Sequence, residues 1–362
     1  MPDQSPPWFD AHLDLAFLAE TGRDMHVDPE ESRGRYQPAA VTLPSLAEGR
    51  VTRVLATVFT ESIADPSAPD AETGAFAYPA GDVDKAYVSG MRQLKLYHAW
   101  HNAGVIEMPT RVHPDATASI ATTSRGRRPA EPEAPPLTVG VLVENADPIT
   151  SPDDLGLWVE GGVVAIGLTW ANQGRYASGN SVSPDGPESG LTDLGRALVA
   201  SMDELGVVHD ASHLNDRSLA DLFEATDRRV IASHSNSRAL LADKQRHLTD
   251  DAIREIARRG GVIGLNLCSA FLDDRCWKDG RATIDDAVRL VEHVCEVIGD
   301  RRHVGLGSDM DGGFPASRLP EGVDRPCDLD KIGEALRGRG WNDDDIAGFM
   351  HGNWERVFPV LA

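Results

Sequence analysis

Residues 163–170 read VVAIGLTW, and residues 261–268 read GVIGLNLC. Both runs are apolar at almost every position, so neither shows the alternation of apolar and polar residues that is typical of a strand with one solvent-exposed face. Such runs are typical of strands in a parallel sheet, because helices cover that sheet and keep water from both of its faces. The two runs therefore predict an α/β fold built on a parallel sheet.

Similar runs recur along the chain and alternate with helical patterns. The clearest helical patterns lie at residues 82–103, 191–205, 249–260 and 282–299, and Thr192 stands in a capping position at the start of the second. Eight strands that alternate with helices close most simply into a (β/α)8 barrel of the TIM type. The eight strand candidates are residues 8–15, 51–60, 137–145, 163–170, 206–213, 230–235, 261–268 and 303–310.

A doubly wound open sheet is the alternative fold. Such a sheet would be expected to carry a glycine-rich phosphate loop after its first strand, and neither GxGxxG nor GxxxxGK[ST] occurs there. The length of 362 residues suits one barrel with insertions, since such barrels often reach about 250 residues or more. We therefore expect a single domain over residues 1–362. The segment SRGRRPAEPEAPP (124–136), rich in proline and charge, is expected to be an exposed loop.

The composition argues against several classes of partner. The formal net charge is −22, and a negative surface repels both nucleic acid and anionic lipid. No run approaches the ~20 apolar residues that span a bilayer, and the N-terminal stretch lacks the pattern of a signal peptide, so we expect a cytoplasmic protein. The four cysteines form no CxxC pair, which argues against a disulfide framework and against a thiolate zinc site.

The first strand candidate ends in polar side chains that can bind a cation. It contains His12 and Asp14, and residues two apart on a strand point the same way. Asp10 shares that face and could act behind them. Because active sites of (β/α)8 barrels lie at the C-terminal ends of the strands, polar residues at these ends are the candidates for chemistry.

Three other strand candidates end in potential metal ligands. Glu144 follows six mostly β-branched apolar residues, where a carboxylate is costly to bury without a partner. His213 and His234 each follow a short apolar run, and neutral imidazole is a common zinc ligand. His209 lies four residues before His213 and could support it or belong to the core. Each of these residues taken alone is more often structural.

The eighth strand candidate ends in GSDMDGG, which contains Asp309 and Asp311 on one expected face. Glycines around a strand-end aspartate let a substrate or a metal approach the backbone, although a turn with capping aspartates would look the same. Barrel closure would bring this strand beside the first. Together, two histidine-plus-carboxylate shells that share Glu144 predict two adjacent cations, an arrangement that activates water and polarises a carbonyl.

At this point the sequence resembles the membrane dipeptidase family of zinc metallopeptidases. The matching motifs occur in the family's order and with similar spacing from about residue 8 to residue 358. They are DAHLD (10–14), VENAD (143–147), GLTWAN (167–172), HDASHL (209–214), ASHSN (232–236), RHLTDD (246–251), GLGSDMDG (305–312) and GNWERVF (352–358).

The resemblance implies a distorted (β/α)8 barrel with two zinc ions. His12 and Asp14 would hold one ion, His213 and His234 the other, and Glu144 would bridge them. A hydroxide that bridges the two ions would attack the peptide carbonyl.

The resemblance also assigns roles outside the metal ligands. Asp309 is similar to the family's acidic residue that handles the proton and helps to bind the free amine. Arg246 is similar to the arginine that binds the C-terminal carboxylate, and a guanidinium suits that group. Arg238 is a weaker rival for this role.

One position departs from the family. Animal members have a histidine that contacts the scissile carbonyl, and this chain has Trp170 there. Indole donates one hydrogen bond but cannot exchange protons. Polarisation of the carbonyl would then depend more on zinc, or on a neighbour such as Asn172. Trp170 could equally be a wall of the pocket or part of the core.

Three hypotheses of function follow. The first is a zinc-dependent dipeptidase that takes small dipeptides, and the second is a metal-dependent hydrolase of another small amide, lactam or lactone, which Trp170 motivates. The third is a non-catalytic metal-binding protein on a hydrolase fold, against which the full ligand set argues. The oligomeric state stays open, although general frequency and the family precedent favour a homodimer.

Overall fold

The computed structural model describes residues 6–64, 74–109, 136–242 and 244–362, and it forms a nearly closed parallel barrel surrounded by helices. All eight predicted strands are present, so the barrel prediction is confirmed. The barrel strands are β1 (Trp8–Leu13), β2 (Val51–Val58), β6 (Leu137–Val143), β7 (Val163–Gly167), β8 (Val208–Asp210), β9 (Val230–Ile231), β10 (Ile263–Leu265) and β11 (Val304–Leu306).

The order of the strands explains how the barrel closes. It runs β10-β11-β1-β2-β6-β7-β8-β9, so the last strand lies beside the first, with Asp10 opposite Leu306. The two ends of this order meet at a parallel bridge between Ala232 and Ile263. The backbone N–H of Ala232 donates to the carbonyl of Val262 at 3.0 Å, and that of Gly264 donates to the carbonyl of Ala232 at 2.8 Å. The open-sheet alternative is therefore wrong.

Three short strands lie beside the barrel. Strand β5 (Ile106–Glu107) pairs with β6, and β3 (Glu61–Ile63) pairs with β4 (Ala77–Pro79) in a small separate sheet. Strand β3 follows directly from the C-terminal end of β2, so this small sheet starts at the end of the barrel where β2 finishes.

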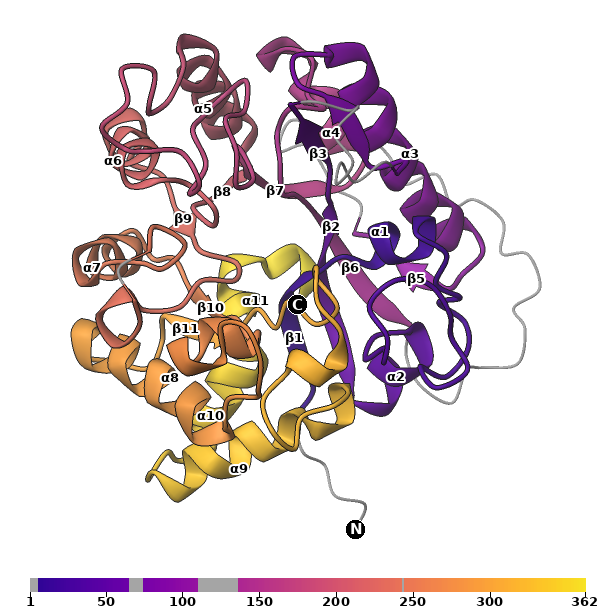
Figure 1. The fold of residues 1–362 in the computed structure, drawn as a ribbon, viewed down its shortest axis with the longest axis vertical. Helices are drawn as coiled ribbons and strands as arrows, with labels where there is room; N and C mark the ends of the chain where they lie inside the picture. Colours follow the sequence, from indigo (N-terminus) through magenta and orange to yellow (C-terminus); the bar gives the residue numbers. More distant parts are fainter. Residues whose placement is uncertain (1–5, 65–73, 110–135, 243) are drawn as a thin grey trace, which may run out of the picture.

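The helices lie outside the strands, as Figure 1 shows for α5 to α8 along one side and α3 along the other. The four predicted helices are confirmed as α3, α5, α7 and α8, and the Thr192 side chain caps α5 by accepting from the backbone of Gly195. The helices are α1 (Leu15–Glu20), α2 (Leu43–Glu48), α3 (Val83–Asn102), α4 (Leu155–Glu160), α5 (Asp193–Leu205), α6 (Asp216–Ala225), α7 (Asp250–Arg258), α8 (Ile284–Ile298), α9 (Asp330–Gly338), α10 (Asp343–Ala347) and α11 (Asn353–Val357).

The C-terminal segment closes one end of the barrel. In Figure 1, α11 lies across the middle of the ring of strands. The side chains of Trp354, Phe358 and Leu361 form one buried cluster with inward-facing strand residues such as Phe9 and Leu55. The indole of Trp354 donates to the carbonyl of Leu306 at 2.9 Å. Because apolar side chains fill this end of the barrel, a functional site is expected at the opposite end.

Some sequence predictions fall at the limits of the description. The expected loop at 124–136 lies outside the described residues, apart from Pro136. All four cysteines are free. Among the described helices, none combines the length and the apolar character needed to cross a membrane.

Candidate metal centre and cavity

The predicted metal ligands meet at the C-terminal ends of the strands. His12 lies within β1, and Asp14 follows that strand directly. Glu144 is the first residue after β6. His213 and His234 lie shortly beyond β8 and β9, where the chain has left the sheet. All five side chains are buried, although they are polar or ionisable.

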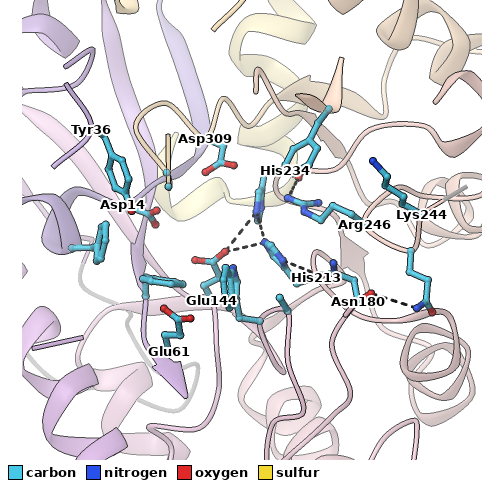
Figure 2. A pocket seen from close by; sticks show the side chains of 18 of the residues that line it. Asp14, Tyr36, Glu61, Glu144, Asn180, His213, His234, Lys244, Arg246 and Asp309 are labelled. Carbon is cyan, nitrogen blue, oxygen red and sulfur yellow. Dashed lines mark hydrogen bonds and ion pairs between the residues drawn. The ribbon is translucent and has the colours of Figure 1, made fainter. Parts of the chain in front are cut away.

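The donor atoms converge on the Glu144 carboxylate, and Figure 2 shows the approach of His213 and His234 to it. Glu144 Oε1 lies 3.2 Å from His213 Nε2, 3.6 Å from His234 Nε2 and 3.6 Å from His12 Nε2. The two Nε2 atoms of His213 and His234 are 2.9 Å apart. His12 Nε2 lies 3.8 Å from Asp14 Oδ1. The donor atoms of these residues therefore lie close together around the carboxylate of Glu144.

Two groups of donor atoms are close enough to hold a cation each. One contains His12, Glu144 and His234, and the other contains His12, Asp14 and Asp309. The structure thus places Asp309 beside the donors, whereas the resemblance gave it roles in handling the proton and in binding the free amine. It also stacks the rings of His12 and His234, whose centroids are 3.5 Å apart.

The outer nitrogen of each imidazole faces a protein group. Nδ1 of His213 lies 3.2 Å from Asn180 Oδ1, and Nδ1 of His234 lies 2.8 Å from Ser233 Oγ. Nδ1 of His12 lies 3.3 Å from the same serine oxygen. Each ring is thereby held with Nε2 toward the centre, as outer partners commonly hold histidine ligands.

This donor set fits a metal cation. When Asn180 Oδ1 and Ser233 Oγ accept from Nδ1, the Nε2 lone pairs of His213 and His234 face each other across 2.9 Å. Two such lone pairs repel unless a proton or a cation lies between them. Burial lowers the pKa of both imidazoles well below its usual value, so a proton is disfavoured. Nitrogen and carboxylate oxygen donors suit zinc and similar transition metals.

The buried carboxylates of the centre would also favour the binding of a cation. Burial raises the pKa of Glu144 and of Asp309 well above the usual values, and the neighbouring Asp14 raises both further. Burial raises the pKa of Asp14 to about 6, and the Thr57 hydroxyl that donates to it opposes that shift. A bound cation would offset the cost of burying these charges.

The backbone is strained where the site residues leave the strands. His213, Asp309 and Asp311 have φ values of 69°, 58° and 63°, in the left-handed region that few non-glycine residues adopt. Since β11 ends at Leu306, the two aspartates lie on a turn, and the expectation that they share one face is wrong. Asp311 instead forms a buried ion pair with Arg23, away from the donor atoms.

Asp309 is held in place from two directions. Its Oδ2 accepts from the side-chain amide of Asn266 at 2.8 Å, and its backbone N–H donates to the carbonyl of His12 at 3.2 Å. A Cβ on Gly312 would lie 1.8 Å from Asp309 Oδ1, so glycine is required there. Asp309 therefore faces the centre in a fixed orientation.

A cavity of about 740 Å³ opens over the centre. Arg246 lies in its wall and is buried. Its Nη1 donates to Ser235 Oγ at 3.0 Å and its Nη2 to the carbonyl of His234 at 2.8 Å. Its Nε has no hydrogen-bond partner among the described residues. The other lining residues are Asp14, Phe17, Tyr36, Phe59, Glu61, Glu144, Trp170, Ala171, Asn180, His213, His234, Lys244, Gln245, Phe271, Trp277, Asp309, Gly312 and Gly313.

The rival arginine is engaged elsewhere. Arg238 donates to both carboxylate oxygens of Asp216, at 2.9 and 2.6 Å, and to the carbonyl of His247 at 2.9 Å. It does not line the cavity. Of the two arginines considered from the sequence, Arg246 is the one that the fold brings to the centre.

Trp170 lines the cavity, whereas Asn172 does not. The indole lies 5.9 Å from the ring of His213 and 5.4 Å from that of Phe59, measured between centroids. The Asn172 side chain is exposed, and the backbone carbonyl of this residue accepts from Gly179 at 2.9 Å. The amide that does reach the centre is Asn180, through His213.

Two further candidates from the sequence have structural positions. Asp10 accepts from the backbone of Ser308 at 2.8 Å and of His12 at 3.2 Å, so it links β1 to the end of β11. His209 turns outward to Asp203, with Nε2 2.7 Å from Oδ1. His209 and His213 do not share a face, because the chain leaves β8 after Asp210.

Several residues of the site were not identified from the sequence. Asn266 and Asp210 follow apolar runs, so the strand-end signal that found Glu144 could have found them too. Ser233 directly precedes a predicted ligand. Lys244 and Trp277 come from loops, and no pattern in the sequence places them over the centre.

The fold and the site define a class of protein, a (β/α)8 barrel with a candidate metal centre at the C-terminal ends of its strands. A family model described as membrane dipeptidase (peptidase family M19) matches residues 3–361. The chain therefore belongs to this family, and the resemblance found in the sequence is confirmed.

Individual proteins are similar to this chain in sequence or in fold. An uncharacterized protein in the pqqA 5′ region of Klebsiella pneumoniae is 32% identical over 56% of this chain and 74% of its own length. Dipeptidase aclJ of Aspergillus oryzae is 31% identical over 56% of this chain, which spans 46% of that protein. A Rhodobacter sphaeroides metallopeptidase, solved with a phosphinate mimic of the dipeptide L-Ala-D-Ala, has a similar fold, with a TM-score of 0.75 and 22% identity over 99% of this chain and 100% of that one.

Proposed function

We propose that this protein is a zinc-dependent dipeptidase that uses two zinc ions. His12 and Asp14 would hold one ion, His213 and His234 the other, and Glu144 both. The observation that carries the proposal is the convergence of three imidazole Nε2 atoms on one buried carboxylate beneath a cavity. When bound, such a pair of ions polarises a carbonyl and makes water a better nucleophile at neutral pH.

The cavity offers complementary charges to a small zwitterion. Figure 2 shows Asp309 and Arg246 on either side of His234. The guanidinium of Arg246, which lines the cavity, would bind the substrate's C-terminal carboxylate. Asp309 would bind the free amine, and the amide of Asn266 holds its carboxylate in place for this. A dipeptide carries both charges at a fixed separation.

The residues around the scissile bond have distinct tasks. Asp309 would accept a proton from the attacking water and pass it to the leaving amine, since its carboxylate lies beside the donor atoms and is held there by Asn266. Trp170, packed on the ring of His213, would form the apolar wall beside the carbonyl and limit the access of water. It would not transfer a proton.

The comparisons support dipeptides as the substrate class. The Aspergillus relative bears the name dipeptidase, and the ligand of the Rhodobacter structure mimics a dipeptide. Both observations concern those proteins, and the residues that would recognise a dipeptide here are Arg246 and Asp309.

A substrate panel tests the proposal. The protein is dialysed against a chelator, reloaded with zinc, and assayed on free dipeptides and on the same dipeptides with an acetylated amine or an amidated carboxylate. We expect cleavage of the free dipeptides only, and only after zinc is restored. Equal cleavage of the blocked forms would contradict the roles of Asp309 and Arg246.

The second candidate is hydrolysis of another small amide, a lactam or a lactone. Trp170 favours it, because an apolar indole beside the carbonyl suits substrates without a charged amine. Turnover of N-acylated amino acids or lactones, with free dipeptides left intact, would replace the first proposal by this one. Stoichiometric zinc without turnover of any of these compounds would favour a non-catalytic role.

A further inference from the structure

One serine hydroxyl touches two of the histidines of the centre. Ser233 Oγ lies 2.8 Å from Nδ1 of His234 and 3.3 Å from Nδ1 of His12. It also lies 2.5 Å from Asp210 Oδ2, to which it donates. All four side chains are at most 1% exposed. Ser212 Oγ also lies 3.3 Å from the hydroxyl oxygen of Ser233. The hydroxyl therefore has four close polar partners and no access to water.

The position of Asp210 determines what the hydroxyl can do. Its Oδ1 accepts from the backbone N–H groups of Ser212 at 3.0 Å and Ser233 at 2.8 Å. Burial raises the pKa of Asp210, whereas the hydrogen bonds from Ser233 and Ser212 lower it. The side chain comes from the end of β8, and Ser233 follows β9, so the contact also spans two neighbouring strands.

Counting donors and acceptors fixes the protons of both rings. A serine hydroxyl has one hydrogen and two lone pairs, and an ionised carboxylate only accepts. The single hydrogen of Ser233 goes to the carboxylate of Asp210 at 2.5 Å and not to the more distant Ser212 Oγ at 3.3 Å, so the oxygen can only accept from the imidazoles. His12 and His234 must then both carry their hydrogen on Nδ1. This leaves both Nε2 lone pairs free on the side of Glu144.

We propose that Asp210 and Ser233 form a positioning pair that sets the tautomer and the orientation of two histidines at once. The inference rests on the proposed metal centre, because a free Nε2 lone pair is what a metal ligand needs. It does not rest on the nature of the substrate. Neither residue touches the cavity, so the pair would act only through His12 and His234.

A similar pair nearby provides a matched control. Ser308 donates its backbone N–H to Asp10 Oδ1 at 2.8 Å and its hydroxyl to Asp10 Oδ2. Its hydroxyl accepts from the backbone of Met310 at 3.2 Å, and no imidazole contact is found for it among the described residues. Ser308→Ala therefore removes the same kind of buried hydroxyl–carboxylate bond without touching a ligand.

The first experiment measures zinc affinity by competition with a chromophoric chelator. We expect Ser233→Ala to weaken zinc binding by about 10–100-fold, as is usual when an outer partner of a ligand is lost. Ser308→Ala should stay within about 2-fold of the wild type, since its hydroxyl orients no ligand. Equal losses in both variants would overturn the proposal, because they would show a general effect of removing a buried hydroxyl.

Asp210→Asn is the more specific test, because asparagine has nearly the same size and shape as aspartate. An amide that keeps its oxygen toward the two backbone N–H groups must turn its NH2 to Ser233, where it occupies one of the two lone pairs of the hydroxyl. The hydroxyl can then accept from only one imidazole, and its hydrogen turns to the other imidazole or to Ser212 Oγ. One of the two rings then loses the acceptor for its Nδ1–H, and zinc binding should weaken although no side chain has been shortened. Wild-type affinity in this variant would count against the proposal.

The wild-type protein supplies a test that needs no substitution. Metal-free protein labelled with ¹⁵N-histidine should show the Nδ1–H tautomer for His12 and His234 by NMR, with the proton between His213 and His234 carried on Nε2 of His213. An Nε2–H tautomer for either ring would overturn the inference. Absence of dipeptide turnover would leave these readouts intact, so failure of the proposed function and failure of this inference are distinguishable.

Discussion

Glu144 is the residue on which the centre depends most directly. Three imidazole nitrogens lie within 3.6 Å of its Oε1, and no other carboxylate among the described residues has that position. Replacing it by glutamine keeps the volume but substitutes an amide for a charged ligand. Because an amide cannot bridge two cations as a carboxylate does, both ions should bind less tightly.

We therefore expect Glu144→Gln to lower zinc affinity by more than the ~10–100-fold that is typical of outer-shell changes. Turnover should fall with the metal content, measured by mass spectrometry of the dialysed protein. Glu61→Gln is the control, since Glu61 lines the cavity but belongs to neither group of donors. Full zinc content in Glu144→Gln would show that this carboxylate is not a ligand.

His247 provides a pH-dependent prediction away from the donors. It is buried against the ring of Phe271, with centroids 5.5 Å apart, and neither ring nitrogen has a hydrogen-bond partner among the described residues. Burial, and then the neighbouring Arg246, lower its pKa to about 3. The unfolded chain takes up this proton near pH 6.5. The contribution of the neutral His247 ring to the free energy of unfolding is therefore complete above about pH 6.5 and is lost as the pH falls toward 3.

His247→Leu should remove this dependence. Between pH 6 and pH 4, the free energy of unfolding of the metal-free wild type should fall faster than that of the variant, by up to about 1.4 kcal/mol per pH unit. Urea unfolding of both metal-free proteins across this range measures the difference. Parallel curves would show that His247 titrates alike in the folded and unfolded states.

The sequence identifies the candidate ligands because they stand at or near the ends of predicted strands. His12, Glu144 and His234 stand at strand ends, and a barrel must bring strand ends together. The sequence could not predict Asn180 or Lys244, which reach the centre from loops whose path depends on tertiary packing. Asn172 illustrates the same limit, because the turn after β7 points its side chain to solvent.

At the scale of elements, the predicted strands are longer than the observed ones. The stretch 230–235 yields only Val230–Ile231 as β9. The residues beyond it leave the sheet, and the backbone N–H of Ser235 donates to the carbonyl of Gly264 at 2.9 Å. This departure brings His234 over the centre. Hydropathy does not distinguish a residue in a strand from an apolar residue just beyond it, so the ends could not be predicted.

Glycines permit a close approach of the backbone where the two ends of the strand order meet, at the bridge between Ala232 and Ile263. We call this place the seam of the barrel. A Cβ on Gly264 or on Gly307 would lie 1.8 Å from the carbonyl oxygen of Ser233. That oxygen belongs to the backbone and cannot move away without shifting the adjacent His234. The barrel thus closes tightly beside His234, one of the candidate ligands.

We expect Gly264→Ala to destabilise the protein by about 1–3 kcal/mol or more, the usual cost of overpacking a buried site. Zinc affinity should fall as well, because the backbone of His234 shifts. Gly156→Ala in α4 is the control, since a Cβ there meets nothing within 4 Å. It should stabilise by about 0.5–1 kcal/mol, as alanine for glycine does inside a helix. Unchanged stability and zinc affinity in Gly264→Ala would mean that the seam is looser than the structure indicates.

At the scale of the whole molecule, the two ends of the barrel have opposite character. The C-terminal segment packs Trp354 and Phe358 into one end, which is apolar. The other end buries Asp14, Glu144 and Asp309 around the centre. The apolar end stabilises the fold by the removal of hydrocarbon from water, whereas the acidic end stabilises it only when cations are present.

Removal of the metal should therefore destabilise the whole barrel. The donors come from β1, β6, β8 and β9 and their following turns, so the unfolded chain offers no comparable site. A ligand that binds only the folded state adds RT ln(1 + [L]/Kd) to the free energy of unfolding, about 2.7 kcal/mol for each site at 100 times Kd.

Calorimetry should show Tm falling on chelation and rising with added zinc. The rise should continue beyond saturation of the sites, because the term grows with the logarithm of free zinc. In Glu144→Gln the rise should shrink with the lost affinity, and a Tm independent of zinc in the wild type would mean that the unfolded chain binds the ion equally well.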